Sequence, residues 1–340
     1  MKRIFSVFLA LTIIASLLCW NVVPAKAEAA KRLSIVTTIF PEYDWVRQIL
    51  GEKFPEADVT MLLDNGVDLH SYQPTADDIV KISDCDLFIY VGGESDEWVE
   101  DALRNAANRN MKVINLLEVL GDSVKTEEIV EGMQEEEHED AEEHEHEDAH
   151  AHEDAEEHEH EEETDEHVWL SLKNAKMLVR VISKALQELD PDNKDIYAAN
   201  ADAYVKKLSA LDAEYQAAVD AASNKTILFG DRFPFRYLVD DYGLRYYAAF
   251  VGCSTETEAG FETISFLAKR VDEWKLPCVL TIEGARHKIA ETIVRNTTAK
   301  NQRVLTMDSM QSTTSKDVKN GTTYLSVMEK NLSVLKEALR

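Results

Sequence analysis

Residues 193–222 have the sequence NKDIYAANADAYVKKLSALDAEYQAAVDAA. Large apolar and aromatic side chains recur in this stretch at spacings of three, four and seven residues, a pattern typical of one amphipathic α-helix. They are Tyr197, Tyr204, Leu208, Leu211 and Tyr215. At the rise of an α-helix, about 30 residues reach roughly 45 Å, which is long enough to connect two halves of a protein. We therefore expect a rigid linking helix in residues 191–223.

Short β-rich runs alternate with stretches of helical period on both sides of this helix. The alternation is typical of α/β lobes whose sheets are mostly parallel and flanked by helices. Expected strands cover residues 33–37, 58–62, 87–91 and 112–114 before the helix, and 226–229, 246–250, 278–282 and 303–306 after it. The predicted fold class is α/β with two lobes. The N-terminal lobe takes residues 28–120 and is completed by a helix in 167–190, and the C-terminal lobe takes residues 224–340.

The first 27 residues have the features of a secretory signal peptide. A basic start is followed by an apolar run in residues 4–18 and by the small-residue triplet AKA at 25–27, which suits cleavage. Cys19 ends the apolar run and offers an alternative, a lipid anchor, but the large Leu18 before it disfavours that processing. The sequence predicts secretion across the cytoplasmic membrane, to the periplasm or the cell surface.

Residues 121–166 are expected to form a disordered, acidic, His-rich loop. The part from 135 to 166 holds 20 carboxylates and no Lys or Arg, so it supplies 20 of the negative charges in a net charge of -28. The unit HEDAEEHEH occurs twice, at 138–146 and 152–160. Such a segment has almost no apolar surface to bury and its like charges repel, so nothing offsets the entropy cost of ordering it.

Histidines interleaved with these carboxylates indicate divalent metal binding, because imidazole is a common ligand for transition metals and the acids attract cations. The alternative is a plain solvated acidic tract. The auxiliary metal ligands predicted in the loop are His138, His144, His146, His150, His152, His158 and His160. Protons compete for the same nitrogens, so metal binding should weaken as pH falls through the histidine range.

Three cysteines follow the signal peptide, at Cys85, Cys253 and Cys278. Cys253 and Cys278 could form a disulfide in an oxidising compartment. Equally, all three could be thiols, because Cys85 and Cys278 flank apolar, strand-like runs. The sequence leaves both alternatives open.

Histidine is scarce outside the acidic loop, where only His70, His287 and, at the edge of the loop, His167 occur. His70 lies in a turn-rich loop after an expected strand, and ligands collect at the carboxyl ends of strands in open α/β sheets. His167 precedes an expected helix. On residue type alone, His70 could also be an ordinary surface histidine, and His167 the last residue of the charged run.

The stretches 66–75, GVDLHSYQPT, and 165–171, DEHVWLS, resemble the metal-binding proteins of ABC uptake transporters, in particular the zinc-type subfamily with a His- and acid-rich insert before the second stretch. The resemblance covers essentially the whole mature chain, including the long connecting helix. It implies two α/β lobes joined by a rigid helix, with a metal ion held in the cleft between them. It also implies that His70 and His167 bind that metal.

The resemblance implies two further ligands from the second lobe, and here the sequence departs from the family pattern. Arg232 falls on a position that is usually His or Glu, and a guanidinium cannot bind a cation. Asp231, one residue earlier, could serve as the ligand or could instead cap the following helix. Glu283 matches the carboxylate expected at the end of a strand. His287 is a further candidate for the missing nitrogen ligand, or a surface residue.

From these features we predict an extracytoplasmic binding protein, not an enzyme, that captures a divalent transition metal and delivers it to an ABC permease. Zinc is the first choice because of the His-rich loop, and manganese the second because two histidines and two carboxylates also suit harder ions. A metal buffer or adhesin on the same scaffold is the alternative, and a secreted metal-dependent hydrolase is a remote one. The acidic charge disfavours nucleic acid as a partner, and we expect a monomer.

Overall fold

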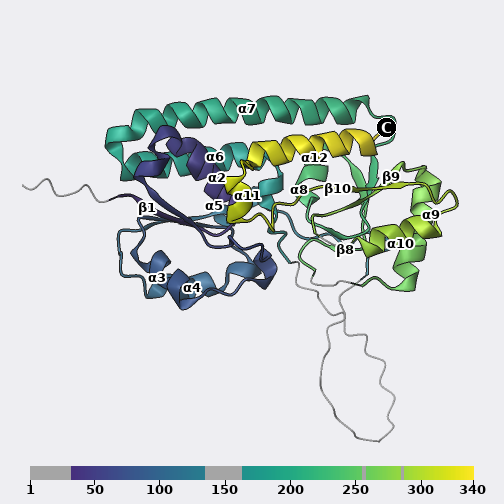
Figure 1. Ribbon diagram of the computed structural model, residues 1–340, viewed down its shortest axis with the longest axis horizontal. Helices are drawn as coiled ribbons and strands as arrows, with labels where there is room; N and C mark the ends of the chain where they lie inside the picture. Colours follow the sequence, from purple (N-terminus) through teal and green to yellow (C-terminus); the bar gives the residue numbers. More distant parts are fainter. Residues whose placement is uncertain (1–31, 135–162, 255–257, 285–286) are drawn as a thin grey trace, which may run out of the picture. The chain divides into compact units, whose positions relative to one another are not determined.

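The structure, a computed structural model, describes residues 32–134, 163–254, 258–284 and 287–340 (Figure 1). The predicted signal peptide, Cys19 and the seven auxiliary histidines of the acidic loop lie outside these residues. The expected α/β class is confirmed, with parallel strand pairs in both halves of the chain. In the part of the chain that is described, no helix is both long enough and apolar enough to cross a bilayer.

The first lobe is built on a four-stranded parallel sheet in the order β2-β1-β3-β4. Its strands are β1 (Ser34–Thr37), β2 (Asp58–Met61), β3 (Leu87–Tyr90) and β4 (Lys112–Asn115). The helices of this part of the chain are α2 (Phe40–Leu50), α3 (Ala76–Asp84), α4 (Trp98–Arg104) and α5 (Leu116–Leu120). Because the strands are parallel, their carboxyl ends share one edge, and the loops after β2 and β3 meet there.

The second lobe repeats this class with strands of two to four residues. Parallel pairing joins β5 (Thr226–Leu228) to β7 (Arg245–Tyr247), β9 (Cys278–Thr281) to β10 (Arg303–Thr306), and β6 (Arg232–Phe233) to β8 (Phe250–Val251). A bridge between Phe229 and Leu280 connects the first two pairs. The helices here are α8 (Arg236–Tyr242), α9 (Phe261–Trp274), α10 (Lys288–Asn296) and α11 (Ser315–Lys319).

One strand expected over 246–250 is instead two short strands, β7 and β8. The chain leaves β7 after Tyr247, and the backbone N–H of Ala249 donates to the backbone oxygen of Asp231. Residues 249–251 thereby change partner from β5 to β6. The residues just after β8 therefore continue from the β6–β8 pair and not from the β5–β7 pair.

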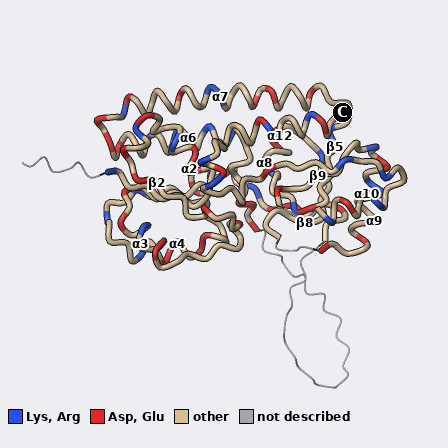
Figure 2. The backbone as a smooth tube through the Cα atoms, in the orientation of Figure 1, with Lys and Arg blue, Asp and Glu red and all other residues tan. Residues whose placement is uncertain are grey.

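The long helix expected over 193–222 is α7 (Lys194–Ala221), which runs beside both halves of the chain next to α6 (Leu172–Leu189) and α12 (Tyr324–Ala338) (Figure 1). Its apolar stripe is buried, while charged residues of both signs recur along its length (Figure 2). Asn200 donates to the backbone oxygen of Ile49 in α2 (2.9 Å), and the Tyr215 hydroxyl donates to that of Met328 in α12 (2.6 Å). The helix is thus bonded to elements from both ends of the chain.

Buried hydrogen bonds tie the two lobes together within the compact unit Leu33–Arg340. At the start of α12, the Tyr324 N–H donates to Asp44 in α2 (2.9 Å) and its hydroxyl donates to the backbone oxygen of Trp169 (2.7 Å). The Trp169 indole N–H in turn donates to the backbone oxygen of Ser309, in the loop after β10 (2.8 Å). These bonds restrict the lobes to small relative motions.

Cys85, Cys253 and Cys278 are all free thiols in the described part of the chain, so the thiol alternative applies. Cys85 and Cys278 are buried, and burial raises the pKa of each to about 12. These two cysteines are therefore inert residues of the core.

Asp96 is a buried carboxyl in the first lobe. One of its oxygens accepts the N–H of Gly92 (3.0 Å), and the other has no partner. Burial raises the pKa of Asp96 to about 7. The folded protein therefore prefers the protonated acid, whereas the unfolded chain ionises it near pH 4.

Replacing Asp96 by Asn should make the protein's stability less dependent on pH. The pKa of Asp96 is higher in the folded state than in the unfolded state. The free energy of unfolding therefore falls as pH rises from about 4 to about 7, and Asp96 contributes least to stability where it is ionised in both states. We expect the native protein to lose roughly 1–3 kcal/mol more than Asp96→Asn between about pH 5 and pH 8 in urea unfolding. The exposed Asp101→Asn is the matched control, and parallel pH profiles for Asp96→Asn and the native protein would contradict the prediction.

Candidate metal centre

His70 stands in the loop that follows β2, in a short 3-10 turn formed by Leu69–Ser71. The side chain of Asp68 begins this turn by accepting the backbone N–H of His70 (3.1 Å). The Nδ1 atom of the ring lies 2.8 Å from the Ser95 hydroxyl and 3.4 Å from a carboxylate oxygen of Glu166. Because Ser95 and Glu166 contact Nδ1, the Nε2 atom on the other side of the ring faces away from the loop.

His167 lies directly before another 3-10 turn, Val168–Leu170, and is fully buried. Its backbone N–H and its Nδ1 both contact the same oxygen of Asp165, at 2.9 and 3.0 Å. A carboxylate on Nδ1 fixes the tautomer and leaves Nε2 for another partner, the usual arrangement of a metal-binding histidine. That partner is close, because the Nε2 atoms of His70 and His167 are 3.2 Å apart.

The pKa values of the two imidazoles shift in opposite directions. Burial and then the neighbouring His167 lower the pKa of His70 to about 3, so His70 is neutral near pH 7. Burial also opposes charge on His167, but the charge and hydrogen bond of Asp165 outweigh it and raise the pKa of His167. A proton shared between the two Nε2 atoms would satisfy both rings, and a metal ion bound at this point would replace it.

Cys253 is a third possible ligand, and sequence reasoning missed it. The ligand atoms of His70, His167 and Cys253 all lie within 4.8 Å of one another. The sequence signal was weak, because Cys253 looked like one half of a disulfide or a buried thiol. Its position three residues after the end of the expected strand 246–250, at a strand's carboxyl end, is the feature that could have indicated a site.

Cys253 is half-buried and lies against acids. Its backbone N–H donates to Glu127 (2.8 Å). Glu127 belongs to the stretch 121–166 that the sequence predicts to be disordered, but residues 121–134 and 163–166 have defined structure, including a bridge between Thr126 and Thr164. Burial, followed by the charges of Glu127, Asp165 and Glu166, raises the pKa of Cys253 well above its ordinary value. Free of metal, Cys253 is therefore a thiol.

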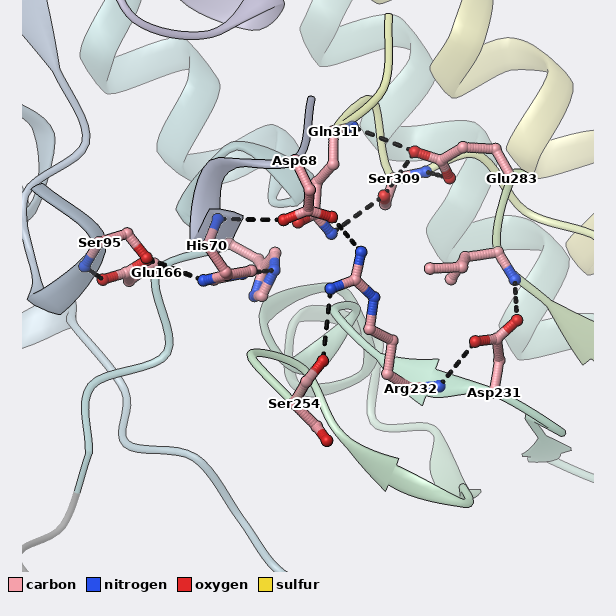
Figure 3. Close-up of polar contacts among 12 residues, drawn as sticks. Asp68, His70, Ser95, Glu166, Asp231, Arg232, Ser254, Glu283, Ser309 and Gln311 are labelled. Carbon is pink, nitrogen blue, oxygen red and sulfur yellow. Dashed lines mark hydrogen bonds and ion pairs between the residues drawn. The ribbon is translucent and has the colours of Figure 1, made fainter. Parts of the chain in front are cut away.

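Arg232 enters the same region from β6. Its guanidinium forms an ion pair with Asp68 across the lobes, and it also donates to the backbone oxygen of Ser254 (3.4 Å) (Figure 3). With its amide oriented to satisfy its neighbours, Gln311 donates to both oxygens of Asp68 (3.0 and 3.1 Å) and accepts from His167 Nε2 (3.3 Å). Arg232 is thus a neutralised cation beside the histidines.

The predicted ligands Asp231 and Glu283 point to partners in their own lobe. Asp231 accepts from the Arg232 N–H (3.0 Å), the Thr281 hydroxyl (2.6 Å) and the Ile282 N–H (3.3 Å). Glu283 accepts from the Ser309 N–H (2.6 Å), the Ser309 hydroxyl (2.7 Å) and the Gln311 N–H (3.1 Å). Neither belongs to the group formed with His70 and His167 among the described residues.

Two alternatives from the sequence are also resolved. Asp231 does not cap α8, which begins at Arg236 after Phe235. His287 directly precedes α10, and its Nδ1 contacts the Thr281 hydroxyl (2.9 Å), so it supports the end of β9. The structure therefore brings together His70 and His167, and it places His287 elsewhere.

Two imidazole nitrogens and one sulfur fit a transition metal such as zinc, which prefers four nitrogen, sulfur or oxygen ligands in a tetrahedron. The donors come from different segments and converge on one point. Harder ions such as magnesium prefer six oxygens, which this group does not offer.

Comparisons with known proteins agree with this chemistry. A family model described as "ZnuA: Zinc-uptake complex component A periplasmic" matches residues 35–338. The "Zinc-binding lipoprotein AdcA" of Streptococcus pneumoniae is 32% identical over 337 residues, covering 99% of this chain and 61% of the relative. The "High-affinity zinc uptake system protein ZnuA" of Bacillus subtilis is 31% identical over 308 residues, covering 91% of this chain and 88% of the relative.

A solved structure is similar as well. The Zn(II)-bound ZnuA-like domain of Streptococcus pneumoniae AdcA has a TM-score of 0.67 and 29% identity, covering 91% of this chain and 99% of that domain. The chain itself spans 61% of the length of the streptococcal AdcA proteins that it matches.

Replacing Asp165 by Asn should weaken zinc binding, because the neutral amide no longer holds the His167 Nδ1–H with a charge. We expect affinity to fall by roughly 10- to 100-fold, as when such an outer carboxylate is lost. A competition titration against a chromophoric chelator measures the change, and the exposed Asp77→Asn in α3 is the matched control. Equal affinities for Asp165→Asn and the native protein would contradict a ligand role for His167.

Proposed function

The chain belongs to the family of the periplasmic zinc-uptake complex component A, and from that premise we propose that it captures zinc outside the cytoplasm and delivers it to an ABC permease. It binds and releases its cargo without catalysing a reaction. The observation that carries the proposal is the pair of buried imidazoles, whose Nε2 atoms lie 3.2 Å apart while both Nδ1 atoms are engaged. Such a pair is preorganised to share one cation.

Zinc is the cargo that this donor set favours over manganese. Manganese would call for oxygen ligands, and the two predicted carboxylates, Asp231 and Glu283, each already accept three hydrogen bonds. Either carboxylate would have to give up some of these bonds to reach a metal. Asp231 and Glu283 stay predicted ligands, and His70 and His167 are the ligands on which the proposal rests.

Release depends on a small shift between the lobes. His70 belongs to the first lobe, whereas Arg232 and Cys253 approach from the second. The bonds of α7, Trp169 and Tyr324 oppose a wide hinge. A shift small enough to keep these bonds still disturbs ligands that must lie about 2 Å from zinc.

The acidic loop supplies the centre with metal as a weak antenna. Both of its flanks are anchored close to the centre: the Gln134 N–H donates to the backbone oxygen of Ala249 (2.9 Å), and the Glu127 N–H donates to that of Glu163 (2.8 Å). Glu163 precedes His167 by only four residues. Metal held near that flank is therefore at high local concentration beside the two histidines.

Replacing His70 by Ala should abolish the tight zinc site and leave only weak binding to the acidic loop. In a variant without residues 135–163, we expect one zinc ion to bind tightly. In that variant, His70→Ala should lower the zinc affinity by at least about 100-fold, because one of few ligands is lost. Isothermal titration with zinc and with manganese measures both. His287→Ala is the matched control, and tight binding that survives His70→Ala would overturn the proposal.

Removing residues 135–163 should slow zinc capture when zinc is scarce but leave the affinity of the centre unchanged. The matched control keeps the length and charge of the loop and replaces its seven histidines by Gln. If histidine is what gathers metal, both variants capture zinc more slowly than the native chain in the presence of a competing chelator. Capture at the native rate by the deletion variant would rule out the antenna, and capture at the native rate by the Gln variant would rule out a role for its histidines.

A further inference from the structure

Cys253 is held in place by contacts on both sides of its own backbone. Its N–H donates to Glu127 (2.8 Å), and the next residue, Ser254, accepts from the Arg232 guanidinium (3.4 Å). The residue before it, Gly252, packs directly on the His167 ring, because a Cβ atom there would lie 3.1 Å from Cε1 and Nδ1. The turn 252–254 therefore approaches the histidine as closely as a glycine allows.

We propose that Cys253 is a metal ligand, and that its thiolate joins His70 and His167 in a centre with two nitrogens and one sulfur. The inference rests on the proposed function and names the ligand that the second lobe contributes. Three groups from separate segments place their ligand atoms within 4.8 Å of one another, close enough to surround one ion. The fourth position of a tetrahedral ion stays open for water or another oxygen.

A bound zinc ion would stabilise the thiolate of Cys253 against the neighbouring carboxylates of Glu127, Asp165 and Glu166, which oppose negative charge on the sulfur. Arg232 and Asp68 neutralise each other, so they add no net charge to the centre. A zinc ion carries two positive charges, which one thiolate and the Asp165 carboxylate behind His167 balance. On binding, the sulfur forms its bond to zinc, and both the thiol proton and the proton held between the two histidines are released to solvent.

Sulfur ligation also predicts selectivity. Thiolate favours zinc, cadmium and cobalt(II) over manganese(II), which prefers oxygen. A centre of this kind would discriminate against manganese without any further device.

Because both histidines precede α6 in the chain and Cys253 follows β8, the cargo itself would bridge the lobes through a single zinc–sulfur bond.

The test is cobalt(II) and cadmium(II) binding by the full chain under a reductant that does not bind metal. A cysteine ligand gives an intense near-ultraviolet sulfur-to-metal charge-transfer band, whereas the nitrogens and oxygens of the acidic loop give none. We expect this band to saturate at one equivalent in the native chain. We expect it to disappear in Cys253→Ser and Cys253→Ala, and to persist in the matched controls Cys85→Ser and Cys278→Ser.

Zinc affinity measured beside manganese affinity gives the second readout. Cys253→Ser should lower zinc affinity by at least about tenfold and manganese affinity by less, which reduces the preference for zinc. A native chain that binds cobalt without the band, or a band that survives in Cys253→Ser, would overturn the inference. If His70→Ala then abolished tight metal binding, the proposed function would stand and only the ligand role of Cys253 would fall. If His70→Ala left tight binding unchanged, the proposed function would be refuted as well.

Discussion

Two imidazole nitrogens 3.2 Å apart in a buried site impose the main constraint on this molecule. Two lone pairs cannot face each other at that distance, so a proton or a metal ion must lie between them. The surroundings are arranged for one such cation: Asp165 holds the far side of His167, and Ser95 with Glu166 holds the far side of His70. The remainder of the fold keeps these two rings from turning apart.

Asp68 links this constraint to the position of the lobes. Its carboxylate accepts the His70 N–H and so shapes the loop that presents the ring, and it also pairs with Arg232 from the second lobe. Arg232 in turn contacts the backbone beside Cys253. A movement of the second lobe would therefore disturb the ion pair, the His70 loop and the Cys253 turn together, which couples lobe motion to the proposed metal ligands.

The alternation of strands and helices, and the long helix α7, could be predicted because each depends on local hydrophobic period. His70 and His167 could be singled out because histidine is rare outside the acidic loop and both lie next to recognisable stretches. Cys253 could not be singled out in the same way. Its role depends on the switch from β7 to β8, and this switch carries the turn 252–254 onto the His167 ring. No local pattern encodes that change of partner.

The carboxylates of the second lobe illustrate a further limit of sequence reasoning. Glu283 lies at the end of a strand as expected, yet its oxygens meet the N–H groups of Ser309 and Gln311. Gln311 then reaches His167, while the Ser309 backbone oxygen accepts the indole of Trp169 from the first lobe. Glu283 thus fixes the loop of Ser309 and Gln311, which contacts both Trp169 and His167. To reach a metal ion, the Glu283 carboxylate would have to give up some of its hydrogen bonds to Ser309 and Gln311, so its contribution to affinity depends on the rigidity of the loop that it holds.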